Sequence, residues 1–238
     1  MGETGSDPES PMPTLVIANK CYSSWSLRPW LLLRQLGVAF DEVLIPLGQP
    51  DTGSRIREHS PAGRVPILKD GDVTVWDSLA IAEYAAERWP EARVWPEDRA
   101  ARALARSVSA EMHSGFAALR NACPMNLGKR FGTRDRGEAV GRDVARIEAS
   151  WQSARSRYGQ GGAFLFGAFS AADAMYAPVV TRFETYSVPV SPASRAYMDA
   201  VLALSAFREW RDAALWEPWF YKEDEVDEEP FADLRRPG

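Results

Sequence analysis

The hydrophobic positions divide the chain into two regions with different periodicity. Between residues 13 and 90, short apolar runs such as 14–18 and 73–76 have the length and the β-branched content of strands. They alternate with segments of helical spacing, of which residues 77–89 are the clearest. The order of these segments predicts a thioredoxin-like β-α-β-α-β-β-α domain over residues 13–90.

Turn-forming residues separate the predicted elements of this first domain. Gly37 follows a helical run over residues 26–36, as glycine often does at the end of a helix. The stretch 69–72, Lys-Asp-Gly-Asp, lies between two β-rich runs and predicts a hairpin. Pro90 ends the third helix.

From residue 97 to about residue 220 the pattern is helical throughout. This region predicts an all-helical domain, joined to the first by a short linker at 90–96. The predicted helices cover residues 97–128, 134–158, 170–185, 192–203 and 205–215. Residues 1–12 have the composition of a disordered leader, and residues 221–238 of a solvated, mobile acidic tail.

Composition and charge narrow the classes of partner. The net charge of −5 disfavours nucleic acid as a partner, because nucleic-acid binding needs a basic surface. The 238 residues hold no apolar run of membrane-spanning length. Two cysteines, without metal-ligand spacing, fit a reducing compartment such as the cytoplasm and predict no bound metal.

Three serines, Ser23, Ser24 and Ser26, lie at the N-terminus of the first predicted helix. Serine caps helices, and this alone could explain them. Alternatively, a hydroxyl at this electropositive end could donate to a bound thiolate. A hydrogen bond to a charged group contributes about 1.5–3 kcal/mol, which would lower a thiol pKa by roughly one to two units.

Cys21 supports a different chemistry. Together with Ser24 it forms a C-x-x-S pattern after the first strand, close to the C-x-x-C placement of thiol-disulfide enzymes. A cysteine near a helix start can be a low-pKa nucleophile. However, Cys21 lies five residues before the expected capping residue Ser26, which is too far for strong activation by the helix.

Val65-Pro66 opens a strand that otherwise has a buried pattern. Proline cannot donate to a sheet, so it belongs at the entry or edge of a strand. A cis bond here would leave the main chain of Val65 available to an extended peptide ligand. Simple strand entry is an equally good explanation of the local sequence.

Asp77-Ser78 precedes the third helix. The pair could be a helix cap and nothing more. It could also recognise an amino-acid head group, with Ser78 and the free N–H groups binding a carboxylate and Asp77 binding an ammonium. In the second region, Ser170 and Asp173 have the spacing of a structural capping box.

In combination, these motifs resemble the cytosolic glutathione transferases over about residues 13–220. The resemblance rests on the serine-rich helix start, on 60–68 (SPAGRVPIL), on 77–81 (DSLAI) and on 167–173 (GAFSAAD). The stretch 23–28, SSWSLR, is similar to S-S-C-S-W-R of the zeta class, but it has Trp25 in place of that cysteine. This departure argues against a zeta-type isomerase and favours a bacterial-type transferase.

The resemblance implies specific roles for individual residues. Ser23 would stabilise the thiolate of glutathione, with Ser24 as the alternative. Further glutathione contacts are expected from Val65, a cis Pro66, Asp77 and Ser78, and from the weaker candidates Arg28, Gln49, His59 and Arg64. The wall of the electrophile site is expected from Met112, Phe116, Arg120 and Asn121. The family also implies a homodimer.

The sequence therefore predicts a glutathione transferase that conjugates glutathione to a small electrophile. Three alternatives stay open: a glutathione-dependent cis–trans isomerase of the maleylacetoacetate type, a Cys21-based thiol transferase, and a non-catalytic binding module with the same fold.

Overall fold

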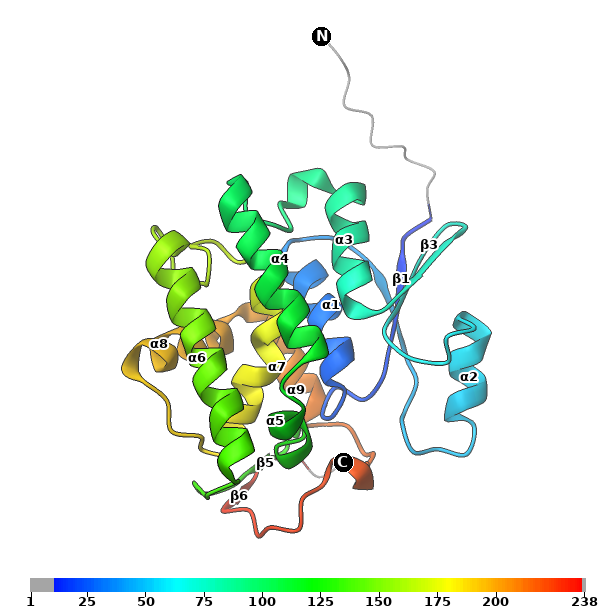
Figure 1. Cartoon of the computed structure of the whole chain (residues 1–238). Helices are drawn as coiled ribbons and strands as arrows, with labels where there is room; N and C mark the ends of the chain where they lie inside the picture. The colour runs from blue at the N-terminus through cyan, green and yellow to red at the C-terminus, as the bar shows by residue number, and fades with distance from the viewer. Residues whose placement is uncertain (1–10, 237–238) are drawn as a thin grey trace.

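Four short strands form one mixed sheet in a computed structural model that describes residues 11–236 (Figure 1). Their order in the sheet is β2-β1-β3-β4. β1 and β2 are parallel, whereas β3 pairs antiparallel with β1 and β4. The strands are β1 (Thr14–Ile17), β2 (Asp41–Leu44), β3 (Ile67–Asp70) and β4 (Val73–Trp76).

Three helices complete the predicted β-α-β-α-β-β-α order: α1 (Ser24–Gln35), α2 (Thr52–His59) and α3 (Ser78–Arg88). α1 connects β1 to β2, because parallel neighbours need a crossover. The hairpin between β3 and β4 turns at Gly71, whose φ of +55° suits glycine. The predicted thioredoxin-like fold is thus confirmed.

The start of α1 differs from the prediction. The helix begins at Ser24 and is capped by Ser23, whose side chain accepts from the N–H of Ser26. A helix that started after Ser26 would have Pro29 in its first turn, whereas Pro29 lies inside the observed helix. Cys21 also lies closer to the helix start than the sequence suggested, because the cap is Ser23 and not Ser26.

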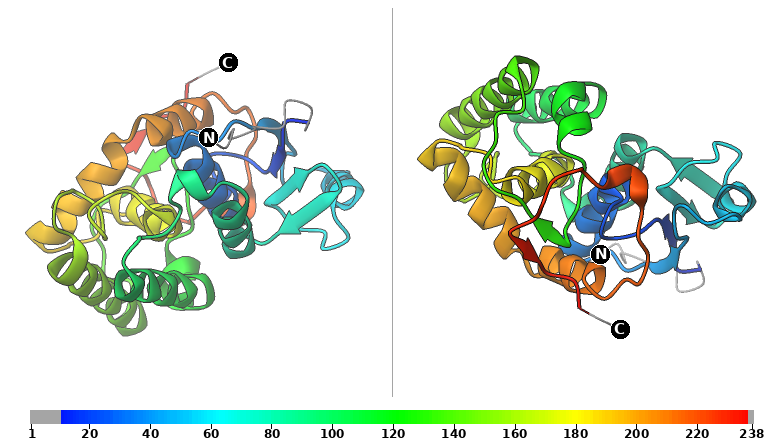
Figure 2. Two further views of the ribbon diagram at one scale, coloured as in Figure 1. Left: turned by 90° about the horizontal axis from the view of Figure 1, so that it is seen from above. Right: turned by 90° about the horizontal axis from the view of Figure 1, so that it is seen from below.

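The second domain is helical, as predicted (Figure 2). The prediction of one long helix over 97–128 is wrong. The helix ends at Ser114, and a second one begins at Ala117, because Phe116 takes a left-handed φ of +57°. The elements are η1 (Pro90–Ala92), α4 (Arg99–Ser114), α5 (Ala117–Ala122), β5 (Lys129–Arg130), α6 (Glu138–Tyr158), α7 (Ala171–Thr185), α8 (Pro192–Ala203), α9 (Ser205–Ala214), η2 (Lys222–Asp224) and β6 (Ala232–Asp233).

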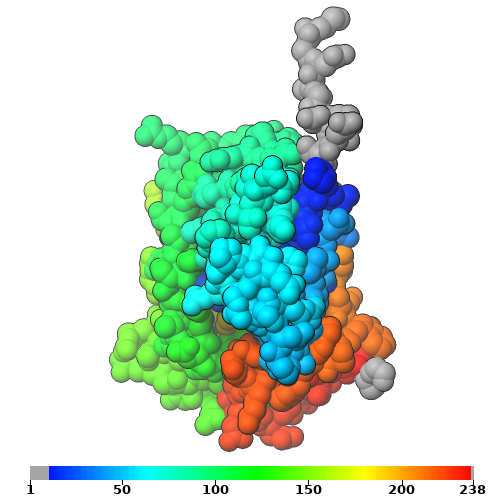
Figure 3. Space-filling view, turned by 90° about the vertical axis from the view of Figure 1, so that its right-hand side faces the viewer, coloured from blue at the N-terminus to red at the C-terminus, as the bar shows by residue number. Residues whose placement is uncertain are grey.

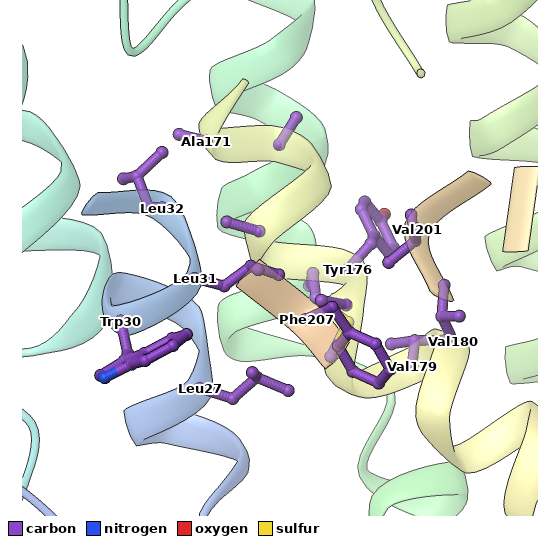
Figure 4. Close-up of a cluster of buried hydrophobic side chains, with 14 of the residues drawn as sticks. Leu27, Trp30, Leu31, Leu32, Ala171, Tyr176, Val179, Val180, Val201 and Phe207 are labelled. Carbon is purple, nitrogen blue, oxygen red and sulfur yellow. The ribbon is translucent and has the colours of Figure 1, made fainter. Parts of the chain in front are cut away.

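The apolar core joins the two domains. α7 is buried along nearly its whole length, and its N-terminus carries the predicted capping box of Ser170 and Asp173. α1 packs directly against α7. Figure 4 shows side chains of α1, α7 and α9 meeting there, among them Leu27, Trp30, Leu31, Tyr176, Val179 and Phe207. Burial of this surface holds α1, and the residues at its start, in a fixed place.

The acidic C-terminal segment is packed, although we expected a mobile tail. Glu225 lies within 2.7 Å of Lys129, and Glu228 within 2.7 Å of Arg136. β6 pairs with β5, and the segment crosses beneath α1 (Figure 2). The charge run therefore reflects specific ion pairs. Residues 1–10 of the predicted leader, and 237–238, lie outside the described residues.

None of the helices between residues 11 and 236 combines the length and the apolar character that a membrane crossing needs.

Candidate active site

A cleft of about 620 Å³ lies where the first domain meets the second. This is a usual size for a small-molecule site. Figure 3 faces the side of the molecule where the first domain (blue to cyan) borders helices of the second (green). Six predicted site residues line the cleft: Arg64, Val65, Pro66, Asp77, Ser78 and Arg120. Four residues that were not predicted complete the lining: Trp25, Ala62, Trp76 and His113.

Val65 and Pro66 form one wall, and the peptide bond between them is cis. β3 begins only at Ile67, so Val65 lies outside the sheet ladder. Among the described residues, its main-chain N–H and C=O make no hydrogen bond. A half-buried main chain without partners, facing a cleft, can pair with an extended peptide.

Asp77 caps α3 in an unusual conformation. Its φ is +78° and its ψ 134°, which residues other than glycine rarely adopt. Oδ1 accepts from the N–H of Leu79 at 2.8 Å and from that of Ala80 at 3.4 Å. Such backbone outliers concentrate at functional sites.

Ser78 follows at the first position of α3 and is 2% exposed. Its Oγ has no hydrogen-bond partner among the described residues, although it lines the cleft. Leaving a buried hydroxyl without a partner costs about 1–3 kcal/mol. A ligand carboxylate at this helix start would satisfy the hydroxyl and meet the positive end of the helix dipole.

His113, on α4, reaches across the domain boundary to Asp77. Its Nε2 lies 2.6 Å from Asp77 Oδ2. The sequence offered no pattern for this pair, because a lone histidine is more often a packed or surface residue. Only the packing of α3 against α4 brings the two side chains together.

The predicted thiolate residues lie at the start of α1 but do not line the cleft. Ser23 Oγ donates to Ser26 Oγ at 2.8 Å and accepts from the N–H of Ser26 at 3.3 Å. Ser26 Oγ also accepts from the N–H of Ala18 at 3.0 Å. The hydroxyl of Ser24 forms no hydrogen bond with a described residue. Ser23 is therefore a helix cap, and Ser26 links the start of α1 to the end of β1.

Trp25, which stands where the similar zeta-class stretch has cysteine, lies close to two guanidinium groups. Those of Arg28 and Arg120 are 4.2 Å and 4.9 Å from the centre of its ring. Arg28 is buried and donates to the carbonyls of Ser24 and Met175. Burial and the neighbouring arginines hold the pKa of Arg28 well below its usual range.

The structure does not bring the remaining predicted residues to the cleft. Gln49 is exposed in a turn, His59 ends α2, and Asn121 is exposed on α5. Met112 is fully buried beneath the domain interface, and Phe116 turns the chain between α4 and α5. Arg28 supports the wall through Trp25 without lining the cleft.

Cys21 is poorly placed for thiol chemistry. It is 1% exposed, and burial raises the pKa of its thiol to about 11. At neutral pH the nucleophilic thiolate is therefore a negligible fraction. Residues 11–236 also hold no group of three or more His, Cys, Asp and Glu side chains placed to bind a metal ion.

Comparison with known proteins gives the same result for both regions of the chain. Residues 22–88 match the family description "Glutathione S-transferase, N-terminal domain", and residues 106–213 match "Glutathione S-transferase, C-terminal domain".

Similar curated proteins include maleylacetoacetate isomerases of two rodents. The protein from Rattus norvegicus is 31% identical over 206 residues, which cover 82% of this chain and 90% of the relative. The protein from Mus musculus is 30% identical over 177 residues, or 71% of this chain and 77% of the relative.

Among solved structures, a glutathione transferase homologue from Burkholderia, with bound glutathione, superposes with a TM-score of 0.64 at 25% identity. The match covers 86% of this chain and 98% of that one.

Proposed function

The chain belongs to the glutathione S-transferase family, and from this premise we propose that it is an enzyme that binds glutathione in the cleft and activates its thiol. One observation carries the proposal. The orphaned hydroxyl of Ser78, the carboxylate of Asp77 and the unpaired main chain of Val65 share one cleft. Together they offer partners for an amino-acid head group and for the extended peptide attached to it.

Glutathione fits this set of partners group by group. Its α-carboxylate would accept from Ser78 Oγ and from the main-chain N–H of Ser78, because the next two N–H groups of α3 already donate to Asp77. Its ammonium would pair with Asp77, and the main chain of its cysteine would pair with Val65. Arg64, exposed at the rim, is an additional partner for the glycyl carboxylate. Each of these groups of glutathione would exchange a hydrogen bond with water for one with the protein.

The thiol would lie toward the start of α1. We assign the stabilising hydrogen bond to Ser23, with Ser24 as the alternative. The hydroxyl of Ser23 can donate one hydrogen bond, and in this structure it donates to Ser26 Oγ. Because Ser26 can itself donate, rotation of both hydroxyls would free the proton of Ser23 for a thiolate while keeping the bond between the serines. The helix dipole would add to this stabilisation.

The electrophile would bind beside the thiol, between the two domains. Trp25, His113 and Arg120 bound this part of the cleft, so both an aromatic face and positive charge are present. In this proposal residues 13–90 supply the glutathione site, and residues 97–220 together with Trp25 supply the electrophile wall. The enzyme would act in the cytoplasm as a homodimer, as its family implies.

A second candidate activity is the cis–trans isomerisation of a dienoic diacid. It is favoured by the guanidinium groups of Arg28 and Arg120, which add positive charge beside the cleft, and by the names of the rodent relatives. In this reaction the thiolate of glutathione would add to a double bond, allow rotation about it, and leave again. Conjugation instead keeps the new C–S bond: an adduct formed at a double bond takes up a proton, and an adduct formed with an aryl halide expels the halide.

The test is turnover of glutathione with an activated aryl halide and, in parallel, with a cis-dienoic diacid. Ser23→Ala should reduce the rate at least about tenfold, since it removes a hydrogen bond to a charged group. Ser24→Ala is the matched control. Loss of rate only in Ser24→Ala would assign stabilisation of the thiolate to Ser24. Absence of turnover with both substrates would favour a non-catalytic binding module.

A further inference from the structure

His113 is a titratable residue of the cleft that the proposed thiolate chemistry leaves without a role. Resting on the proposed function, we infer that His113 is a specificity-determining residue. It sets the charge that the amino group of glutathione meets at Asp77, and so makes recognition of that amino group depend on pH.

The geometry around Asp77 points to this role. Oδ1 is occupied by two main-chain N–H groups of α3. Oδ2 has one partner among the described residues, His113 Nε2 at 2.6 Å, and both side chains line the cleft. A carboxylate oxygen can accept two hydrogen bonds, so a ligand ammonium would share Oδ2 with the imidazole. The ammonium and His113 therefore act on the same oxygen atom.

The surroundings of the pair are rich in positive charge. The side chain of His113 is 31% exposed, and its ring lies edge-on to Trp25 with centroids 5.3 Å apart. Trp25 in turn stacks on Arg28 and Arg120. The charged groups on the elements that pack around the pair include Asp77 before α3, Arg28 on α1, Arg64 before β3, Arg120 on α5 and Arg182 on α7. Two ion pairs also belong to these elements, Glu83 of α3 with Arg106 of α4, and Glu111 of α4 with Arg146 of α6.

The two charge states of His113 have opposite effects on a ligand ammonium. A neutral imidazole donates one hydrogen bond and leaves Asp77 with its negative charge. An imidazolium cancels that charge and repels the ammonium, in a region where Asp77 faces several guanidinium groups. Histidine changes charge between pH 5 and 8, so affinity should fall as the pH is lowered through this range. By linkage, binding of the amino group should release a proton from His113.

The probe is S-methylglutathione, which has no ionisable thiol and no other group that titrates between pH 5.5 and 8. Its affinity would be measured by calorimetry at constant ionic strength for the unmodified protein, His113→Gln and His59→Gln. Glutamine keeps an N–H donor but cannot take up a proton. His59 is the only other histidine of the chain, and it does not line the cleft.

We expect the affinity of the unmodified protein to fall about three- to tenfold from pH 8 to pH 5.5, since a difference of up to one pKa unit between the free and bound states changes affinity up to tenfold. His59→Gln should keep this dependence and His113→Gln should lose most of it. Equal pH dependence in His113→Gln and the unmodified protein, or none in either, would overturn the inference. A purely structural link between α3 and α4 would weaken binding equally at every pH.

A second measurement needs no variant. The chain has two histidines, so their ring protons can be followed separately by NMR during a pH titration. Addition of S-methylglutathione should move the titration of His113 to lower pH and leave that of His59 in place. A titration of His113 that does not move would contradict the inference. Failure of S-methylglutathione to bind at pH 8 would instead reject the glutathione site itself.

Discussion

The starts of α1 and α3 look alike in sequence but differ in how their hydroxyls are bonded. At α1, Ser23 and Ser26 bind each other, and Ser26 also accepts from the N–H of Ala18. At α3, Ser78 Oγ has no partner among the described residues and lines the cleft. Both positions are buried.

This difference separates capping from binding. Hydroxyls whose bonds are complete contribute to the stability of the folded chain. A buried hydroxyl without a partner costs stability, and where it also lines a cleft it is available to a ligand. The start of α3 therefore has the character of a binding site. The start of α1 gains a binding role only if its serine network rearranges.

The largest effect is expected from Asp77→Asn. Asparagine caps helices as well as aspartate does and tolerates positive φ, so the free energy of unfolding should change by less than about 1 kcal/mol. The lost charge should weaken glutathione binding more than about tenfold, because a hydrogen bond to a charged group is worth about 1.5–3 kcal/mol. Calorimetry and urea unfolding measure the two quantities. An unchanged dissociation constant would mean that Asp77 does not contribute to glutathione binding.

Ser26→Ala and Ser78→Ala should differ in their effects on stability. Ser26→Ala leaves the buried N–H of Ala18 without a partner and should lower the free energy of unfolding by about 1–3 kcal/mol. Ser78→Ala removes a hydroxyl that has no partner, so the empty protein should keep its stability or gain a few tenths of a kcal/mol, while its affinity for glutathione falls. Equal destabilisation by both variants would contradict the distinction between the two helix starts.

Ser23→Ala should act on the thiol and less on affinity. Loss of the donor should raise the pKa of the bound thiol by about one unit, which the ultraviolet absorbance of the thiolate reports during a pH titration. The variant should also lose about 1 kcal/mol of stability, since Ser23 caps α1. If the thiol pKa changes only in Ser24→Ala, Ser24 is the donor.

The smallest effect is expected at the cysteines. Burial raises the thiol pKa of Cys21 and of Cys123 to about 11, so the thiolate forms only as the pH rises toward that value. At pH 7, incubation with oxidised glutathione should leave the mass of the native protein unchanged. A mixed disulfide at Cys21 would revive the thiol-transferase alternative.

The sequence predicted most of the fold because hydrophobic periodicity and turn residues are local properties. The prediction failed where the local structure depends on tertiary packing. The break after Ser114 requires a left-handed Phe116, and the acidic segment is held by Lys129 and Arg136, which lie far away in the chain.

The residues of the site also fall into those that the sequence could predict and those that it could not. Val65, Asp77 and Ser78 could be named because each belongs to a short motif before a strand or a helix. The contacts of His113 with Asp77 and of Trp25 with Arg120 could not be named, because each joins separate elements. Their roles in glutathione binding, like those of the predicted residues, stay predictions.

The most direct test is a calorimetric titration of the purified protein with reduced glutathione. We predict one site per chain with micromolar to low-millimolar affinity, because the hydroxyl of Ser78, the carboxylate of Asp77 and the main chain of Val65 share one cleft. Absence of binding at millimolar glutathione would mean that both helix starts are structural, and would contradict the proposed function.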